Sequence, residues 1–77
     1  MNKARRQWIE KIVNELETQR DELNNVYEEE QEAYDNLPES IQGSERGEEM
    51  YEGIGTIEDA SDSLDELIEN LRELIEK

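Results

Sequence analysis

The chain of 77 residues lacks cysteine, histidine and phenylalanine, and it has a single proline. Without cysteine it cannot form a disulfide, and without histidine it lacks the commonest metal ligand and the side chain that most often serves as a general base. No apolar run approaches the roughly 18 residues that a transmembrane helix needs. The opening residues 1–16 have no continuous apolar stretch of the kind found in signal peptides. We therefore expect a cytoplasmic protein that does not enter a membrane.

Basic side chains are scarce, and acidic ones are abundant. The chain has 23 acidic and 8 basic side chains, which gives a net formal charge of −15. Residues 21–77 hold 20 of the acidic and three of the basic side chains, a net charge of −17, whereas residues 1–20 have a net charge of +2. Such a charge repels the phosphates of nucleic acids and of anionic lipids. It favours a basic protein as the partner.

Apolar residues recur at alternating intervals of four and three residues through the first half of the chain. This main seam runs through Ile9, Val13, Leu16, Arg20, Leu23, Tyr27, Glu30, Tyr34 and Leu37. A second row beside it runs through Ile12, Leu16, Leu23, Val26, Ala33 and Leu37. The spacing predicts a helix over residues 3–36. Because two adjoining rows make a wide apolar stripe, the helix suits a bundle in which it touches two neighbours.

A connection and a second helix follow. Pro38 disfavours helical geometry at Leu37 and marks a turn over residues 37–44. The same spacing then resumes through Met50, Ile54, Ile57, Ser61, Leu64, Ile68, Leu71 and Ile75, with Ala60, Leu67 and Leu74 beside it. This pattern predicts a second helix over residues 45–76. Gly53 and Gly55 interrupt it at about 1 kcal/mol each relative to Ala, so we expect either a kink near residues 53–56 or a close helix crossing there.

These patterns predict an all-α fold, in which the whole chain is one domain and two long amphipathic helices form an antiparallel hairpin. Counting back from the turn places Val13 near Ile68 and Arg20 near Ser61. It also brings the basic start of the first helix beside the acidic end of the second, which predicts charge compensation around residues 3–11. Because a lone hairpin leaves half of each stripe in water, we expect a homodimer that forms a four-helix bundle. The candidate core and dimer residues are Trp8, Ile9, Ile12, Val13, Leu16, Leu23, Tyr27, Ile57, Leu64, Ile68 and Leu71.

The signals for catalysis are weak. Glu28, Glu29 and Glu32 satisfy the pattern EExxE, and Glu28 and Glu32 share a helix face that could hold a hard cation such as Mg²⁺. The pattern resembles one of the all-α nucleotide pyrophosphohydrolases, but the ExxD motif of a later helix is absent in strict form. Such matches arise easily by chance in so acidic a chain. The serines have no histidine to activate them. We therefore expect no enzyme, no cofactor and no metal site.

Three segments are spread along the chain and make up about two thirds of it: NKARRQWIEKIVNEL, EEEQEAYDNLPESIQGSERGEEM and IEDASDSLDELIENL. The central segment, residues 28–50, is the most specific of them. These segments resemble small acidic helical proteins encoded in Firmicutes genomes and in their phages and mobile elements. The resemblance implies a protein of the bacterial or phage cytoplasm and supplies no catalytic residue.

The concentration of acidic side chains predicts a non-enzymatic interaction protein. In its sharpest form it is an inhibitor that mimics DNA and binds a basic, nucleic-acid-binding protein. The candidate partner-binding residues are Glu28, Glu29, Glu32, Asp35, Glu45, Glu48, Glu49, Tyr51 and Glu52. Tyr51 belongs to this set because an exposed tyrosine among acidic residues can anchor a protein contact. The alternatives are a structural or scaffolding helical dimer and, second, a metal-dependent nucleotide pyrophosphohydrolase.

Overall fold

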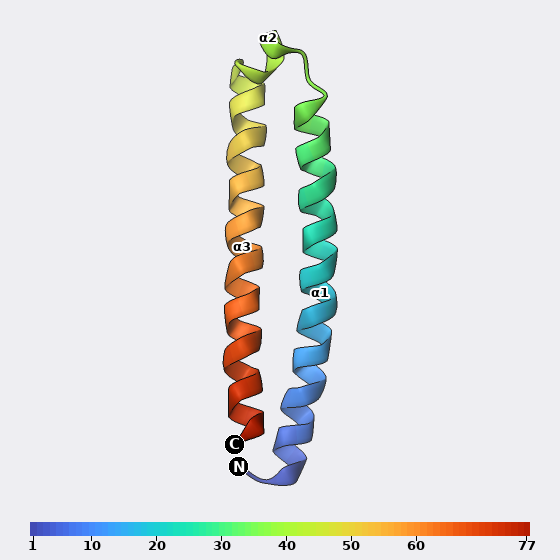
Figure 1. Cartoon of the computed structure of the whole chain (residues 1–77), viewed down its shortest axis with the longest axis vertical. Helices are drawn as coiled ribbons and strands as arrows, with labels where there is room; N and C mark the ends of the chain where they lie inside the picture. The colour runs from blue at the N-terminus through green and yellow to red at the C-terminus, as the bar shows by residue number, and fades with distance from the viewer.

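The computed structural model describes residues 1–77 and consists of helices joined by short turns (Figure 1). Helix α1 is Lys3–Asp35, α2 is Glu39–Gln42 and α3 is Glu45–Glu76. The chain forms no strand, so the prediction of an all-α fold is confirmed. The bounds of α1 and α3 fall within one residue of the expected ranges. None of the three helices combines the length and the apolar character needed to cross a membrane.

Local side chains set where α1 begins and ends. The side-chain oxygen of Asn2 accepts a hydrogen bond from the backbone N–H of Arg5 at 2.8 Å, which satisfies one of the free donors of the first turn. At the other end, the backbone N–H of Asn36 donates to the Glu32 carbonyl, and that of Leu37 donates to the Tyr34 carbonyl, each at 3.0 Å. Pro38 follows two residues later, where it cannot continue the helical hydrogen bonds. The helix therefore stops at Asp35.

The connection contains a single turn of helix, α2, which the sequence pattern did not distinguish from a loop. The Pro38 carbonyl accepts from the backbone N–H groups of Ile41 and Gln42, at 2.9 Å and 3.0 Å. The side-chain amide of Gln42 donates to the Tyr34 carbonyl at 3.0 Å, which ties α2 to the last turn of α1. Ser44 then caps α3, and its hydroxyl oxygen accepts from the backbone N–H of Gly47. The connection is thus closed by its own hydrogen bonds.

Two stretches of backbone approach each other closely at Gly47, and not at Gly53 or Gly55, where a close helix crossing was one of the two expectations. A Cβ atom on Gly47 would overlap the carbonyl oxygens of Ile41 and Gln42, whereas a Cβ on Gly53 or Gly55 would meet no atom within 4 Å. Helix α3 runs unbroken through residues 53–56, and Figure 1 shows no bend there. The expected kink or close crossing is therefore absent. The reason is that these two glycines flank the buried Ile54, so they lie beside the helix contact and not in it.

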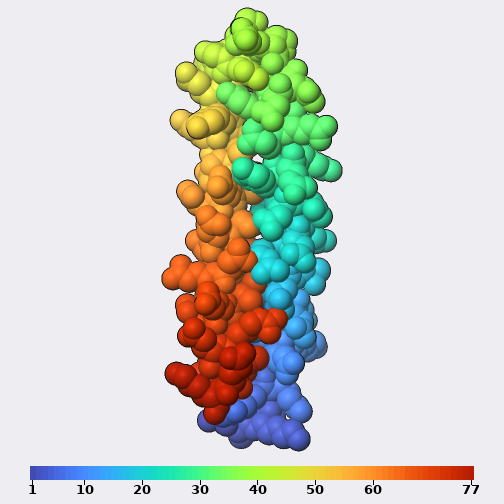
Figure 2. All heavy atoms as spheres, in the orientation of Figure 1, coloured from blue at the N-terminus to red at the C-terminus, as the bar shows by residue number.

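Helices α1 and α3 lie side by side and run in opposite directions, with α2 at one end and both termini at the other (Figure 1). The Cα atoms span 58 × 14 × 13 Å, and their radius of gyration is 17.4 Å. A compact domain of this length has a radius of gyration of about 11 Å. The space-filling view shows a narrow rod in which the two long helices touch along their length (Figure 2).

The buried core of this rod is thin. Val13 has no exposed surface, and Ile54 and Ile68 are the other two buried apolar residues. The other candidate core residues on the facing sides of α1 and α3 are half-buried: Ile9, Leu16, Leu23, Tyr27, Ile57, Leu64 and Leu71. Trp8 and Ile12 are exposed, so they take no part in a core within one chain. So small a core supplies little stability to a single chain.

The register of α1 on α3 differs from the expected one by about one helical turn. The Ser61 hydroxyl donates to Oδ1 of Asn24 at 2.5 Å, and the Arg20 guanidinium donates to Asp65 at 2.9 Å. Ser61 therefore lies level with Asn24, where counting from the turn had placed Arg20. The shift arises because α2 occupies the connection, so the first turn of α3 packs beside α2, beyond the end of α1. Arg20 pairs with an acidic side chain of α3, Asp65, one helical turn beyond Ser61.

Candidate interaction surfaces

The observed register divides the rod into two halves of very different charge. We call residues 21–64 the turn half, and residues 1–20 with 65–77 the open half. The turn half holds 15 acidic side chains and one basic side chain, Arg46, a net formal charge of −14. The open half holds eight acidic and seven basic side chains, a net charge of −1. Almost the entire charge of the molecule therefore lies on the half that contains α2.

All nine candidate partner-binding residues lie in the turn half and are exposed. Four of them, residues 28–35, come from the last turns of α1, and the other five, residues 45–52, come from the first turns of α3. Both groups are therefore at the same end of the rod (Figure 1). The carboxylate of Asp35 accepts a hydrogen bond from Gln31 at 3.0 Å, and none of the acidic members forms an ion pair. Their charges are thus available to a partner.

Tyr51 projects from this acidic end with two thirds of its surface exposed. Its ring lies 5.9 Å from the ring of Tyr34, centroid to centroid, at an interplanar angle of 51°. This tilted arrangement is among the geometries that aromatic pairs favour. The contact joins α3 to α1 and holds one edge of the Tyr51 ring. The rest of the ring faces solvent beside Glu48 and Glu52, with which it lines a shallow hollow of about 280 Å³.

One long face of the rod, which we call the polar face, is held by bonds between the helices. It presents Glu17, Asn24 and Gln31 from α1 and Tyr51, Glu58, Asp65 and Arg72 from α3, each one position after a seam residue. The Arg72 guanidinium donates to the Glu17 carboxylate, and two helical turns further along α1 Asn24 accepts from the Ser61 hydroxyl. Hydrogen bonds to Asp65 and then to Asp21 raise the pKa of the Arg20 guanidinium above its ordinary value.

The basic residues near the N-terminus do not take part in these bonds. Lys3, Arg5, Arg6 and Lys11 form no ion pair within the chain, and the only ion pairs join Arg20 and Arg72 to acidic side chains. The expected compensation of charge around residues 3–11 is therefore not made by direct contacts. The register explains this result, because the first turns of α1 extend to the end of α3 and beyond it.

The opposite long face, the apolar face, has no partner. In an antiparallel pair, the residues just before every second seam residue, such as Val13 and Ile54, form a row at intervals of seven that points to the same side of both helices. On α1 these are Arg5, Ile12, Gln19, Val26 and Ala33, and on α3 they are Arg46, Gly53, Ala60, Leu67 and Leu74. All ten are exposed. Trp8, exposed over 68% of its surface, flanks this face in the open half, where Met1, Arg5, Trp8, Ile9 and Ile12 line an open groove of about 530 Å³.

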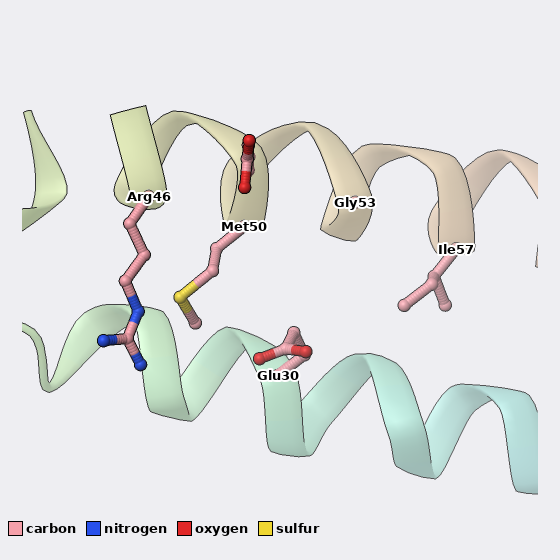
Figure 3. Close-up of a pocket in the computed structure, with 6 residues that line it drawn as sticks. Glu30, Arg46, Met50, Gly53 and Ile57 are labelled. Atoms are coloured by element: carbon pink, nitrogen blue, oxygen red, sulfur yellow. The ribbon is translucent and has the colours of Figure 1, made fainter. Parts of the chain in front are cut away.

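A second groove opens on the apolar face in the turn half, with a volume of about 470 Å³. Figure 3 shows Arg46, Met50 and Ile57 reaching from α3 toward α1, with Glu30 on the opposite side. Gly53 forms part of the wall, and because it has no side chain it leaves the groove open between Met50 and Ile57. We call this the Gly53 groove. It combines a small apolar floor with charged groups at its edge.

The structure brings no three acidic side chains together in an arrangement that could hold a metal ion. Glu28 and Glu32 lie one turn apart on the outer side of α1, exposed to solvent. Sequence reasoning missed the hydrogen bond of Asn24, the ion pair of Glu17 with Arg72, and the role of Gly47. Only the third had a local signal, since Gly47 stands three residues after the capping Ser44.

Comparison of the chain with protein-family models, with curated proteins and with solved structures gave no match. The charge, the shape and the exposed faces of the rod are therefore the features that bear on its function.

Proposed function

We propose that the protein is a non-enzymatic acidic interaction protein whose turn half binds a basic, nucleic-acid-binding protein. The observation that supports this most directly is the net charge of −14 on the turn half, with its candidate residues exposed and unpaired. The turn half covers roughly half of the 58 Å long axis, so it has about one net charge per 2 Å. Duplex DNA has one charge per ~1.7 Å of its axis. A basic groove that accepts DNA would therefore meet a similar density of negative charge here.

The helical placement of the carboxylates adds to this proposal. Carboxylates on a flexible chain lose entropy when a partner orders them, whereas those on α1 and α3 are already held on helices. Attraction over a long range would also speed the encounter with a positively charged partner. The resemblance to small acidic proteins of Firmicutes and their phages would place this encounter in the bacterial cytoplasm, where an inhibitor of a nuclease or regulator fits the chemistry.

The chain itself is the second partner that we propose. The thin core and the unpartnered apolar face support a helical hairpin that dimerises into a four-helix bundle. A purely structural or scaffolding dimer is the alternative function, and the same apolar face supports it. The two functions differ in their response to salt, because scaffolding through an apolar face is insensitive to ionic strength, whereas binding through carboxylates weakens as salt rises.

Affinity capture tests the proposal. The immobilised chain, incubated with a bacterial lysate at low ionic strength, should retain one or a few basic nucleic-acid-binding proteins that salt and competing duplex DNA release. Immobilised polyglutamate is the control, because it offers charge without a fixed arrangement. A protein retained by the folded chain and not by polyglutamate supports the proposal. Retention of the same proteins by both materials, or binding that neither salt nor DNA weakens, would contradict it.

A further inference from the structure

We propose that two copies of this chain pair through their apolar faces in opposite directions, so that the open half of each copy covers the turn half of the other. This inference builds on the proposed dimer and assigns its surface, its direction and its contacts. It does not depend on the identity of the basic partner.

The exposed area is close to what a dimer interface requires. The chain exposes 5939 Å². A compact protein of 9.1 kDa exposes about 4,900 Å². The excess of roughly 1,000 Å² is similar to the ~800 Å² that each partner buries in a standard interface. Six of the eight large apolar residues that are exposed, among them Trp8, Leu67 and Leu74, lie on the apolar face or at its edge. A second copy on this face would remove them from water.

Side-chain size determines the direction. In the open half the apolar members of this face are the large residues Ile12, Leu67 and Leu74, with Trp8 at its edge and the polar Arg5 and Gln19 on the same half. In the turn half it presents Ala33, Gly53 and Ala60, with Val26 as its one larger apolar member, and the Gly53 groove opens there. Copies that run in opposite directions place large residues on small ones, as interdigitated cores require. Copies that run in the same direction place large residues against large ones and leave the groove empty.

The positions agree with a two-fold axis at the boundary of the two halves. Because Ser61 lies level with Asn24, Leu74 is level with about residue 11 of α1, and Gly53 is level with about residue 32. The midpoint lies near residue 21, where the turn half begins. Rotation about an axis at that level brings Leu74 of one copy onto Gly53 of the other and Leu67 onto Ala60. It likewise brings Ile12 onto Ala33.

Charge also favours copies that run in opposite directions. Copies that run in the same direction bring two turn halves together, each with a net charge of −14. Copies that run in opposite directions place each turn half beside an open half with a net charge of −1. The four unpaired basic residues near the N-terminus, residues 3–11, then lie near the acidic end of the other copy. This arrangement lowers the like-charge repulsion that would otherwise oppose association.

Single cysteine variants test the direction, because the natural chain has no cysteine. Thr56, Ser63 and Asn70 are exposed and border the apolar face on α3. With a short bis-maleimide cross-linker, S63C should form covalent dimers by itself, since Ser63 lies next to the proposed axis. T56C and N70C should each fail alone and should cross-link when mixed. Covalent dimers of T56C alone or N70C alone, or none from the mixture, would overturn the proposed direction.

A matched pair of glycine variants tests the contact. Gly53→Leu fills the Gly53 groove and should weaken the dimer by roughly tenfold or more, whereas Gly55→Leu, on the other side of α3, should leave it unchanged. Adding Leu74→Ala to Gly53→Leu should restore part of the affinity. Sedimentation equilibrium measures all three variants and the parent chain. Equal effects of the two glycine variants, or no rescue, would overturn this contact. A parent chain that stays monomeric would overturn the proposed dimer itself, and a dimer of the parent chain with failed cross-linking would overturn only its direction.

Discussion

At the scale of single residues, Gly47 is the glycine whose missing side chain the fold requires. The carbonyls of Ile41 and Gln42 approach it because α2 turns the chain back against the start of α3. That approach depends on Pro38, whose carbonyl accepts the hydrogen bonds that form α2. The sequence pattern could predict a turn at Pro38 but not this contact, because helical spacing contains no information about a single turn of four residues.

Gly47→Ala should lower the free energy of unfolding by about 1–3 kcal/mol, because the new methyl group overlaps two backbone oxygens that cannot move independently. For a domain of this size each kcal/mol corresponds to roughly 4–8 °C in Tm. The measurement is thermal unfolding followed by circular dichroism at a fixed protein concentration. Gly55→Ala is the matched control, and it should stabilise α3 by about 0.5–1 kcal/mol because its Cβ enters open space. Equal Tm values for the two variants would contradict this account of the turn.

At the scale of helices, the sequence predicted α1 and α3 almost to the residue but placed one on the other about a turn away from the observed register. The helices follow from periodicity and from the caps, which are local. The register depends on how much chain the connection consumes, and α2 changes that length. Three residues of α1 then fix the register, because Asn24, Arg20 and Glu17 reach their bonding partners on α3 only when the helices lie at this offset. None of these pairs could be identified from spacing alone.

The pair of Glu17 and Arg72 provides a test of that register. Glu17→Arg alone and Arg72→Glu alone should each destabilise the protein, because they place like charges together. The double exchange should recover about 0.2–1 kcal/mol of coupling, the range found for ion pairs that remain partly exposed. Chemical denaturation at low ionic strength measures the cycle, and the coupling should shrink at high salt. Additive effects of the two substitutions would indicate that the side chains do not meet in solution.

At the scale of the whole molecule, the division of charge is sharper in the structure than in the sequence. Along the chain the acidic residues spread over residues 21–77, whereas in space the antiparallel pairing leaves the open half nearly neutral and concentrates a net charge of −14 beside α2. The apolar face shows the same division, with large residues in the open half and small ones in the turn half. The exposure of the acidic candidate residues could be predicted from periodicity. The coincidence of both divisions at one level of the rod could not, because it depends on the register.

The most direct test of whether the turn half is the binding surface compares two variants. Each loses the same number of negative charges, one from the turn half and the other from the open half. One variant neutralises four turn-half residues: Glu28→Gln, Glu29→Gln, Glu32→Gln and Asp35→Asn. The matched variant neutralises four open-half residues: Glu66→Gln, Glu69→Gln, Glu73→Gln and Glu76→Gln. All eight positions are exposed, and both variants lose four negative charges.

The measurement is the dissociation constant of each variant for the captured basic protein, as a function of salt concentration. The turn-half variant should bind at least about tenfold more weakly, with a smaller dependence on salt, because fewer carboxylates meet the basic surface. The open-half variant should bind nearly as tightly as the parent chain. Equal losses of affinity in the two variants would show that only the net charge matters. A larger loss of affinity in the open-half variant would show that the binding surface lies in the open half, which contradicts the proposal.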